Sequence, residues 1–290
     1  MVSQRSIIVY ELTDNKRQKN MCGISMFFAR ESKPDYEIIE PLFKWSEKRG
    51  TDGFGISIIK RSEPARKITT YRSIYPYSTC KGEVKSFVKV NFDKGDLLLS
   101  NARAAPEQEP PTTETNMQPI VNDGVVVVHN GSVSNFVCVD LKNWSNNTGK
   151  FKFNTQIDSE AIIAEYIRQD KNIKDTCEHL SGGFAAILYD IALDRVYYWT
   201  DFKPLAHMAI RGIGYGLSSS NGCLTEIIED VTDCTRNGEN TWEDFYNHYL
   251  RGQRIKSLDL DSGFIRNIKF SPRFVTQNFD TNFDNDGNRR

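Results

Sequence analysis

The chain has 290 residues, 39% hydrophobic and 26% charged, which is ordinary for a globular protein that buries a core. Its 37 basic and 38 acidic side chains give a formal net charge of −1, and no long basic block indicates nucleic acid as a ligand. The longest apolar runs, such as residues 125–128, are far shorter than the ~20 residues that span a membrane. Neither a nucleic-acid partner nor a membrane partner is expected.

Apolar patterning predicts many short strands and two or three helices. The expected elements, in chain order, are a strand at 23–29, a helix at 36–48, strands at 54–60, 68–74, 96–100 and 125–129, a helix at 158–169, a hairpin of strands 184–189 and 195–200, a second hairpin of strands 207–210 and 215–219, and a short helix from Asn221. Residues 106–119, rich in Pro, Thr and Glu, are predicted to be loop. Strands joined by hairpins favour an α+β fold with antiparallel sheets.

No repeat and no shift of composition divides the chain into two globular units. Residues 1–21 hold only a short apolar patch, too weak for a secretory signal, and are interpreted as an N-terminal extension or propeptide. One domain is expected at 22–274. Residues 275–290 cannot bury enough apolar surface to order themselves and are expected to form a flexible tail.

The cysteines carry no CxxC pair, which argues against a disulfide framework and against a zinc site. They are Cys22, Cys80, Cys138, Cys177, Cys223 and Cys234. This usage suits a reducing cytoplasm, with no metal and no organic cofactor. All except Cys22 are interpreted as inert small hydrophobic residues.

Cys22 differs because it directly follows Met21, a second possible start codon. If translation begins at Met21, or if residues 1–21 are removed, the mature chain opens with cysteine. Its free α-amine, with a pKa of about 7.7–8.0, could then accept the proton of a thiol with a pKa of about 8.5. A cysteine inside the chain lacks that base, so the position matters for nucleophilic chemistry.

Five short motifs follow one another along the chain. They are Met-Cys-Gly-Ile at 21–24, Arg-Gly-Thr-Asp-Gly at 49–53, Asn-Ala-Arg at 101–103, His-Asn-Gly-x-x-x-Asn at 129–135 and Asp-Ser-Glu at 158–160, with further pieces at 180–185 and 201–205. This succession resembles the glutaminase domain of class II glutamine amidotransferases, which are N-terminal-nucleophile hydrolases. The resemblance covers roughly residues 22–225. It implies a four-layer αββα sandwich of two antiparallel sheets.

The resemblance also implies the catalytic residues. Cys22 would attack the side-chain carboxamide of glutamine. The side chain of Asn130 and the backbone N–H of Gly131 would hold the oxyanion that forms. Two fixed neutral donors at that place stabilise developing negative charge. Judged from the residues alone, Asn130-Gly131 after four valines also fits a hairpin turn of the Asn-Gly type.

The resemblance assigns three further residues, Arg103, Asp158 and His129, to the substrate-binding site. Arg103 would hold the α-carboxylate of glutamine with a planar fork that lysine cannot copy, and Asp158 would hold the α-ammonium group. His129 lies beside the oxyanion motif and is expected to pack or to donate to the backbone, because the family assigns the proton to the terminal amine. Taken alone, Arg103 also fits a surface ion pair and Asp158 an ordinary helix N-cap.

The chain departs from the family pattern at two places. Residues 104–107 replace the usual aromatic and Thr-x-Gly neighbours of the arginine, and Thr51 replaces the usual proline. Arg49 and Asp52, on either side of Thr51, are interpreted as structural turn residues near the pocket.

The resemblance implies a stand-alone glutaminase that converts glutamine to glutamate and ammonia through a Cys22 thioester. Because the domain fills most of the chain, an ammonia-accepting synthase is expected on a partner chain. The oligomeric state is not indicated. Two alternatives remain: an N-terminal cysteine amidase for another C–N bond, and a non-catalytic scaffold or particle component that retains the fold and residues 1–20.

Overall fold

The computed structural model describes residues 21–63, 65–105, 110–200, 203, 205–210, 212–220, 222–223, 226–227, 254–262 and 265–268. Several sequence-based expectations fall outside these residues. They concern residues 1–20, the end of the domain at 274, the tail at 275–290, Asp201 and Pro204 of the last motif, Asn221 and Cys234.

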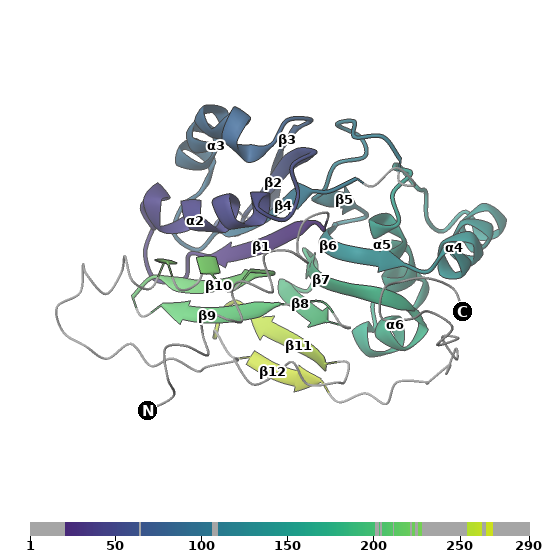
Figure 1. The fold of residues 1–290 in the computed structure, drawn as a ribbon. Helices are drawn as coiled ribbons and strands as arrows, with labels where there is room; N and C mark the ends of the chain where they lie inside the picture. Colours follow the sequence, from purple (N-terminus) through teal and green to yellow (C-terminus); the bar gives the residue numbers. More distant parts are fainter. Residues whose placement is uncertain are drawn as a thin grey trace, which may run out of the picture.

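Twelve strands in the described part of the chain form two fully antiparallel sheets (Figure 1). The first sheet has the order β3-β2-β4-β1-β10-β9 and the second has the order β12-β11-β8-β7-β6-β5. The first contains β1 (Gly23–Phe28), β2 (Gly53–Lys60), β3 (Lys67–Ser73), β4 (Leu97–Arg103), β9 (Ala206–Ile210) and β10 (Gly214–Ser218). The second contains β5 (Ile120–Asn122), β6 (Val125–Val133), β7 (Gly182–Asp190), β8 (Arg195–Thr200), β11 (Arg254–Asp259) and β12 (Ile265–Ile268).

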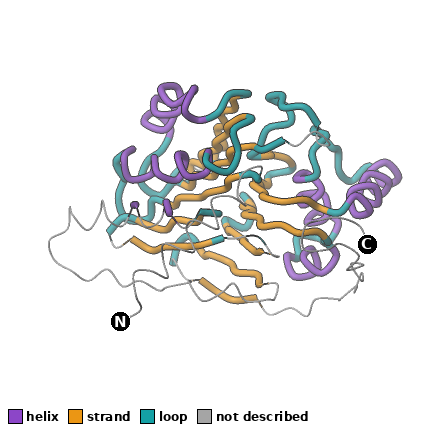
Figure 2. Tube along the Cα trace, viewed as in Figure 1, coloured by secondary structure: helices purple, strands orange, loops and turns teal. Residues whose placement is uncertain are grey.

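Helices cover the outer faces of both sheets (Figure 2). The helices α2 (Tyr36–Glu47) and α3 (Tyr77–Asn91) pack on the first sheet. The helices α4 (Asn135–Thr148), α5 (Ser159–Arg168) and α6 (Ile173–His179) pack on the second. The layers therefore run helix, sheet, sheet, helix, and the expected αββα sandwich is confirmed.

The expectation of two or three helices is wrong, because the described residues contain five. The helices α3, α4 and α6 were not predicted. Each buries only a few side chains: α3, for example, buries Tyr77, Cys80, Val84 and Val88, while Val90 of α3 and Phe136 of α4 are exposed. A narrow apolar stripe of this kind gives a weak helical signal in the sequence.

A third apolar cluster fills the space between the two sheets. On β1 the side chains of Ile24, Met26 and Phe28 enter this cluster, and on β6 those of Val126 and Val128 do so. The residues between them face the helices instead. Side chains alternate along a strand, so every second residue of β1 and of β6 faces the space between the sheets.

Strand β6 continues straight through Asn130 and Gly131. Asn130 pairs with Ala185 of β7, and Gly131 pairs with Phe184. The alternative interpretation of these two residues as a hairpin turn is therefore wrong. Pairing with β7 outweighs the local turn preference of the Asn-Gly pair.

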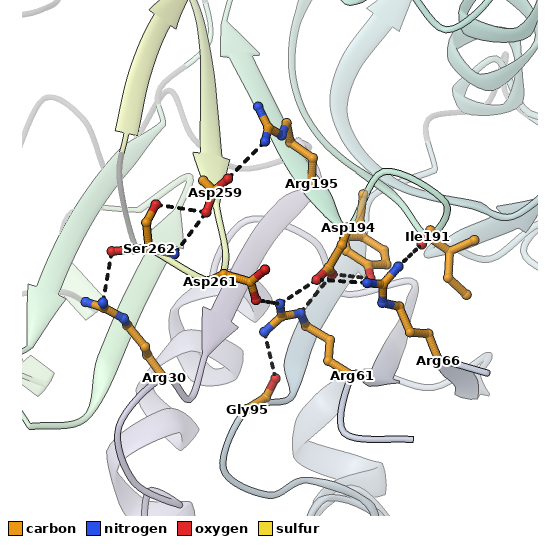
Figure 3. A network of polar contacts seen from close by, with 11 residues as sticks. Arg30, Arg61, Arg66, Gly95, Ile191, Asp194, Arg195, Asp259, Asp261 and Ser262 are labelled. Carbon is orange, nitrogen blue, oxygen red and sulfur yellow. Dashed lines mark hydrogen bonds and ion pairs between the residues drawn. The ribbon is translucent and has the colours of Figure 1, made fainter. Parts of the chain in front are cut away.

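An ion-pair network joins the two sheets at the end of the strands away from Asn130 (Figure 3). Arg61, which follows β2, donates to Asp194 in the turn between β7 and β8 and to Asp261 after β11. Arg66 and the hydroxyl of Tyr189 also contact Asp194. Burial alone would raise the pKa of Asp194, but the hydrogen bonds and charges of these partners hold it below its ordinary value.

Candidate active site

Cys22 lies directly before β1, beside the end of β4. Its Sγ atom accepts a hydrogen bond from the backbone N–H of Ala104 at 3.4 Å and lies 3.6 Å from the carbonyl oxygen of Ala104. The side chain of Arg49 donates from Nε to the carbonyl oxygen of Cys22 at 3.2 Å, and the backbone N–H of Met21 donates to the carbonyl oxygen of Arg49 at 3.2 Å. The turn at 49–53 thus holds the backbone on both sides of the cysteine.

Glycine is required next to Cys22 because of this close approach. A Cβ atom on Gly23 would lie 2.3 Å from the carbonyl oxygen of Ser46 in α2. No real side chain tolerates that distance, so any larger residue at 23 would push β1 away from α2.

Arg103 ends β4 and is buried, with 1% of its surface exposed. Its Nη2 atom donates to the carbonyl oxygen of Pro110 at 2.9 Å. The backbone N–H of Asp52 donates to the carbonyl oxygen of Arg103 at 2.8 Å, and the carboxylate of Asp52 accepts from the N–H of Ala105 at 2.8 Å. The alternative of a surface ion pair at Arg103 is therefore wrong: a buried guanidinium stands at this strand end.

Asn130 shares the inner face of β6 with Val126 and Val128. It is fully buried, and its Oδ1 and Nδ2 atoms have no hydrogen-bond partner within the described residues. An unsatisfied buried polar group costs about 1–3 kcal/mol. The next residue, Gly131, has a φ of 120°, and a Cβ there would lie 2.2 Å from the carbonyl oxygen of Gly183.

Asp158 lies at the end of β6 and directly before α5. Its Oδ2 atom accepts from the backbone N–H of Val133 at 2.7 Å, and its side chain makes no capping hydrogen bond to α5. The N-cap alternative is therefore wrong as a description of the side chain, which bonds to the strand.

His129 projects from the opposite face of β6, toward the helices. Its Nδ1 atom lies 3.1 Å from Oγ of Ser159, and its ring meets that of Phe184 edge-on at 5.3 Å. Complete burial lowers the pKa of His129 below its ordinary value, against the opposing charge of Asp158, whose Oδ1 atom is 3.8 Å away. The imidazole is neutral at pH 7, and it does not face the space between the sheets.

Two further residues near the candidate site, Gln118 and Asn101, had no role assigned from the sequence motifs. Gln118 bonds both backbone groups of His129, accepting from its N–H at 2.6 Å and donating to its carbonyl oxygen at 3.0 Å. Asn101 is fully buried on the inner face of β4, two residues before Arg103. The alternation of β4 could have indicated Asn101 beside Arg103, but no sequence signal indicated Gln118.

Strand β6, which carries Asn130, packs against both β1, which begins directly after Cys22, and β4, which ends at Arg103. Asp158 stands at the end of the same strand, whereas the ring of His129 lies behind it. A thiol, a buried guanidinium and a carboxamide that has no partner among the described residues are groups that suit the attack on an amide of a small charged molecule.

Comparison with known proteins finds a matching family and solved structures with a similar fold. The family described as "Glutamine amidotransferase domain" matches residues 107–226. The chain carries a class II glutamine amidotransferase domain, which is an enzyme domain with the fold of N-terminal-nucleophile hydrolases.

Among curated proteins, the chain is similar to 7-cyano-7-deazaguanine synthase 2 of Sulfurisphaera tokodaii, with 26% identity over 63% of this chain and 40% of the relative. The 7-cyano-7-deazaguanine synthase of Saccharolobus solfataricus is 29% identical over 64% of this chain and 39% of its own length. The isomerizing glutamine–fructose-6-phosphate aminotransferase of S. tokodaii is 27% identical over 68% of this chain and 32% of its own length. The chain thus spans about two fifths or less of these relatives.

Among solved structures, the glutamine phosphoribosylpyrophosphate amidotransferase from B. subtilis has a TM-score of 0.60 and 19% identity. The match covers 86% of this chain and 49% of that one. At this level of identity the similarity establishes the fold.

Within the described residues, no helix is both long enough and apolar enough to cross a lipid bilayer.

Proposed function

We propose that the protein hydrolyses the side-chain amide of glutamine through a thioester on Cys22 and supplies the ammonia to a synthase activity. The observation that supports this most directly is the carboxamide of Asn130, buried without a partner in the described chain on the strand that packs against β1 and β4. A ligand with a hydrogen-bonding oxygen would satisfy it.

The chemistry needs few groups. The α-amine of Cys22 takes the thiol proton, and the sulfur attacks the carboxamide carbon of glutamine. The carbonyl oxygen becomes negative and accepts hydrogen bonds from Nδ2 of Asn130 and the N–H of Gly131, of which one such donor lowers the barrier by about 2.7–4 kcal/mol. The C–N bond then breaks, the nitrogen leaves as ammonia with the transferred proton, and water converts the thioester to glutamate.

Substrate selection falls to two charged residues. The guanidinium of Arg103 stands beside the loop that carries Pro110, where it would pair with the α-carboxylate of glutamine. The carboxylate of Asp158 would take the α-ammonium group while it keeps its bond to Val133. Together they would select the free amino acid over a glutamine within a peptide.

The mechanism requires that no peptide bond precedes Cys22. Met21 stands before it in this sequence, and we propose that translation from Met21 followed by methionine removal, or cleavage after residue 21, frees the amine. Intact-mass measurement of the natively expressed protein tests this: the expected first residue is Cys22, and an uncleaved chain from Met1 would contradict it.

The ammonia acceptor is inferred from the relatives, whose names describe synthase and aminotransferase activities and whose chains are more than twice as long as the matched part. We propose that a synthase activity, on another chain or in another segment, receives the ammonia.

The nucleophile is tested by replacing Cys22 with Ala and measuring ammonia release from glutamine. Loss of activity with an unchanged unfolding midpoint is expected, because the substitution removes the proposed nucleophile and only one sulfur atom of the side chain. Cys138→Ala is the matched control, since Cys138 is also a half-buried cysteine but lies in α4. Activity near that of the parent protein in the Cys22 variant would refute the proposed mechanism.

A further inference from the structure

Asn101 is a second fully buried carboxamide at the same end of the sandwich. It lies on β4, where Leu97 and Leu99 enter the cluster between the sheets and Leu98 and Ala102 face the helices. By this alternation the side chain of Asn101 enters the space between the sheets, on the same face as Arg103. Neither its Oδ1 nor its Nδ2 atom has a hydrogen-bond partner within the described residues.

A series of contacts places Asn101 at the same level as the proposed oxyanion site. Asn101 pairs with Gly55 on β2, and a Cβ on Gly55 would lie 1.9 Å from the carbonyl oxygen of Gln118. Gln118 in turn bonds both backbone groups of His129, the residue before Asn130. The two carboxamides therefore project from facing sheets into one space, next to Cys22 and Arg103.

The two side chains offer complementary chemistry to an amide. The substrate carboxamide presents one oxygen that accepts and one NH₂ group that donates. Asn130 is already proposed to donate to the oxygen. The remaining NH₂ group needs an acceptor, and the buried Oδ1 atom of Asn101 is an acceptor without a partner in the described chain.

We propose that Asn101 is a further substrate-contacting residue, whose Oδ1 atom accepts a hydrogen bond from the carboxamide nitrogen of glutamine and holds that nitrogen as it leaves as ammonia. This inference rests on the proposed function. The step adds no reactant: the sulfur–carbon bond forms, the carbon–nitrogen bond breaks, and the nitrogen departs with its two hydrogens and the proton taken from Cys22. Asn101 orients the leaving group through one hydrogen bond.

The test compares two substrates that form the same Cys22 thioester. Glutamine has a leaving nitrogen that donates hydrogen bonds, whereas the γ-methyl ester of glutamate has a leaving oxygen without a hydrogen. Asn101→Leu removes the acceptor while it keeps the branching and the number of heavy atoms of the side chain. It is expected to lower kcat/KM for glutamine at least about tenfold while it changes kcat/KM for the ester by about twofold or less.

A second variant keeps an acceptor. Asn101→Thr retains a hydroxyl oxygen on a side chain suited to a strand, and it is expected to recover part of the glutamine activity that the leucine variant loses. Ser100→Ala is the matched control: Ser100 is the neighbouring buried polar residue on β4, and its Oγ bonds that of Ser25 at 2.6 Å. This control is expected to affect both substrates equally and weakly.

The outcomes separate this proposal from the proposed function. Equal losses for amide and ester in Asn101→Leu, or no loss for either, would overturn the role of Asn101 while leaving the glutaminase intact. A parent protein with a free Cys22 that hydrolyses neither substrate would refute the proposed function, and the role of Asn101 with it.

Discussion

Gly131→Ala is the substitution whose cost follows most directly from the structure. The added Cβ would stand 2.2 Å from the carbonyl oxygen of Gly183 and 2.7 Å from Cα of Phe184, both backbone atoms of β7 that cannot rotate away. Overpacking costs about 1–3 kcal/mol, and a φ of 120° on a residue with a side chain adds about 1–3 kcal/mol. The free energy of unfolding should fall by about 2–6 kcal/mol.

Urea unfolding measures this loss of stability. Ammonia release from glutamine should fall as well, because the backbone N–H of residue 131, which is proposed to hold the oxyanion, would be displaced. Two control substitutions separate the cost of backbone strain from the cost of the steric clash. Gly149→Ala has a φ of 64° and an open surrounding, so it reports backbone strain alone. Gly183→Ala adds a Cβ that meets no atom within 4 Å and should leave stability nearly unchanged. A Gly131 variant within about 0.5 kcal/mol of the parent protein would refute the reasoning.

Two other predictions concern charge. Arg103→Lys should raise the KM for glutamine substantially, because a point charge replaces a bidentate fork, and steady-state kinetics with an unchanged KM would remove Arg103 from the site. The second concerns His207, whose pKa is lowered to about 4 by burial and then by the charge of Lys256. In the unfolded chain His207 is protonated below its ordinary pKa of about 6.5, whereas in the folded protein it stays neutral until the pH approaches 4. Protonation therefore favours the unfolded state, and the free energy of unfolding should fall by up to about 3 kcal/mol as the pH drops from 6.5 to 4. Urea unfolding at several pH values should show a flatter decline in His207→Gln, and identical slopes in both proteins would contradict the assignment.

Most of the described strands could be predicted from the sequence because their apolar runs are continuous, whereas β5, β11 and β12 were not predicted. The runs that became β1, β2 and the β7–β8 hairpin are bounded by turn residues, and the structure confirms them. The helices α3 and α4 were missed because each turns only a few apolar side chains inward. These helices are stabilised by packing on the sheet, and the sequence of the helix alone does not show that packing.

Some residues of the candidate site could be predicted from the sequence and others could not. The order of the motifs alone indicated Cys22, Arg103 and Asn130, and in the fold the strand of Asn130 packs against β1 and β4, which adjoin Cys22 and carry Arg103. Gln118 could not be predicted, because its position depends on long-range contacts with β2 and β6, whereas the alternation along β4 could have indicated Asn101. The hairpin alternative for Asn130 was wrong because Asn130 and Gly131 pair with residues of β7, more than 50 positions later in the chain, and a four-residue turn pattern cannot show such pairing.

The unbroken course of β6 has a consequence for how such an enzyme could evolve. The strand pairs with β7 at every residue from Val125 to Val133, so Asn130 and Gly131 move only if the whole sheet moves. Groups this firmly seated need little rearrangement during the reaction, but they also leave little freedom to adapt.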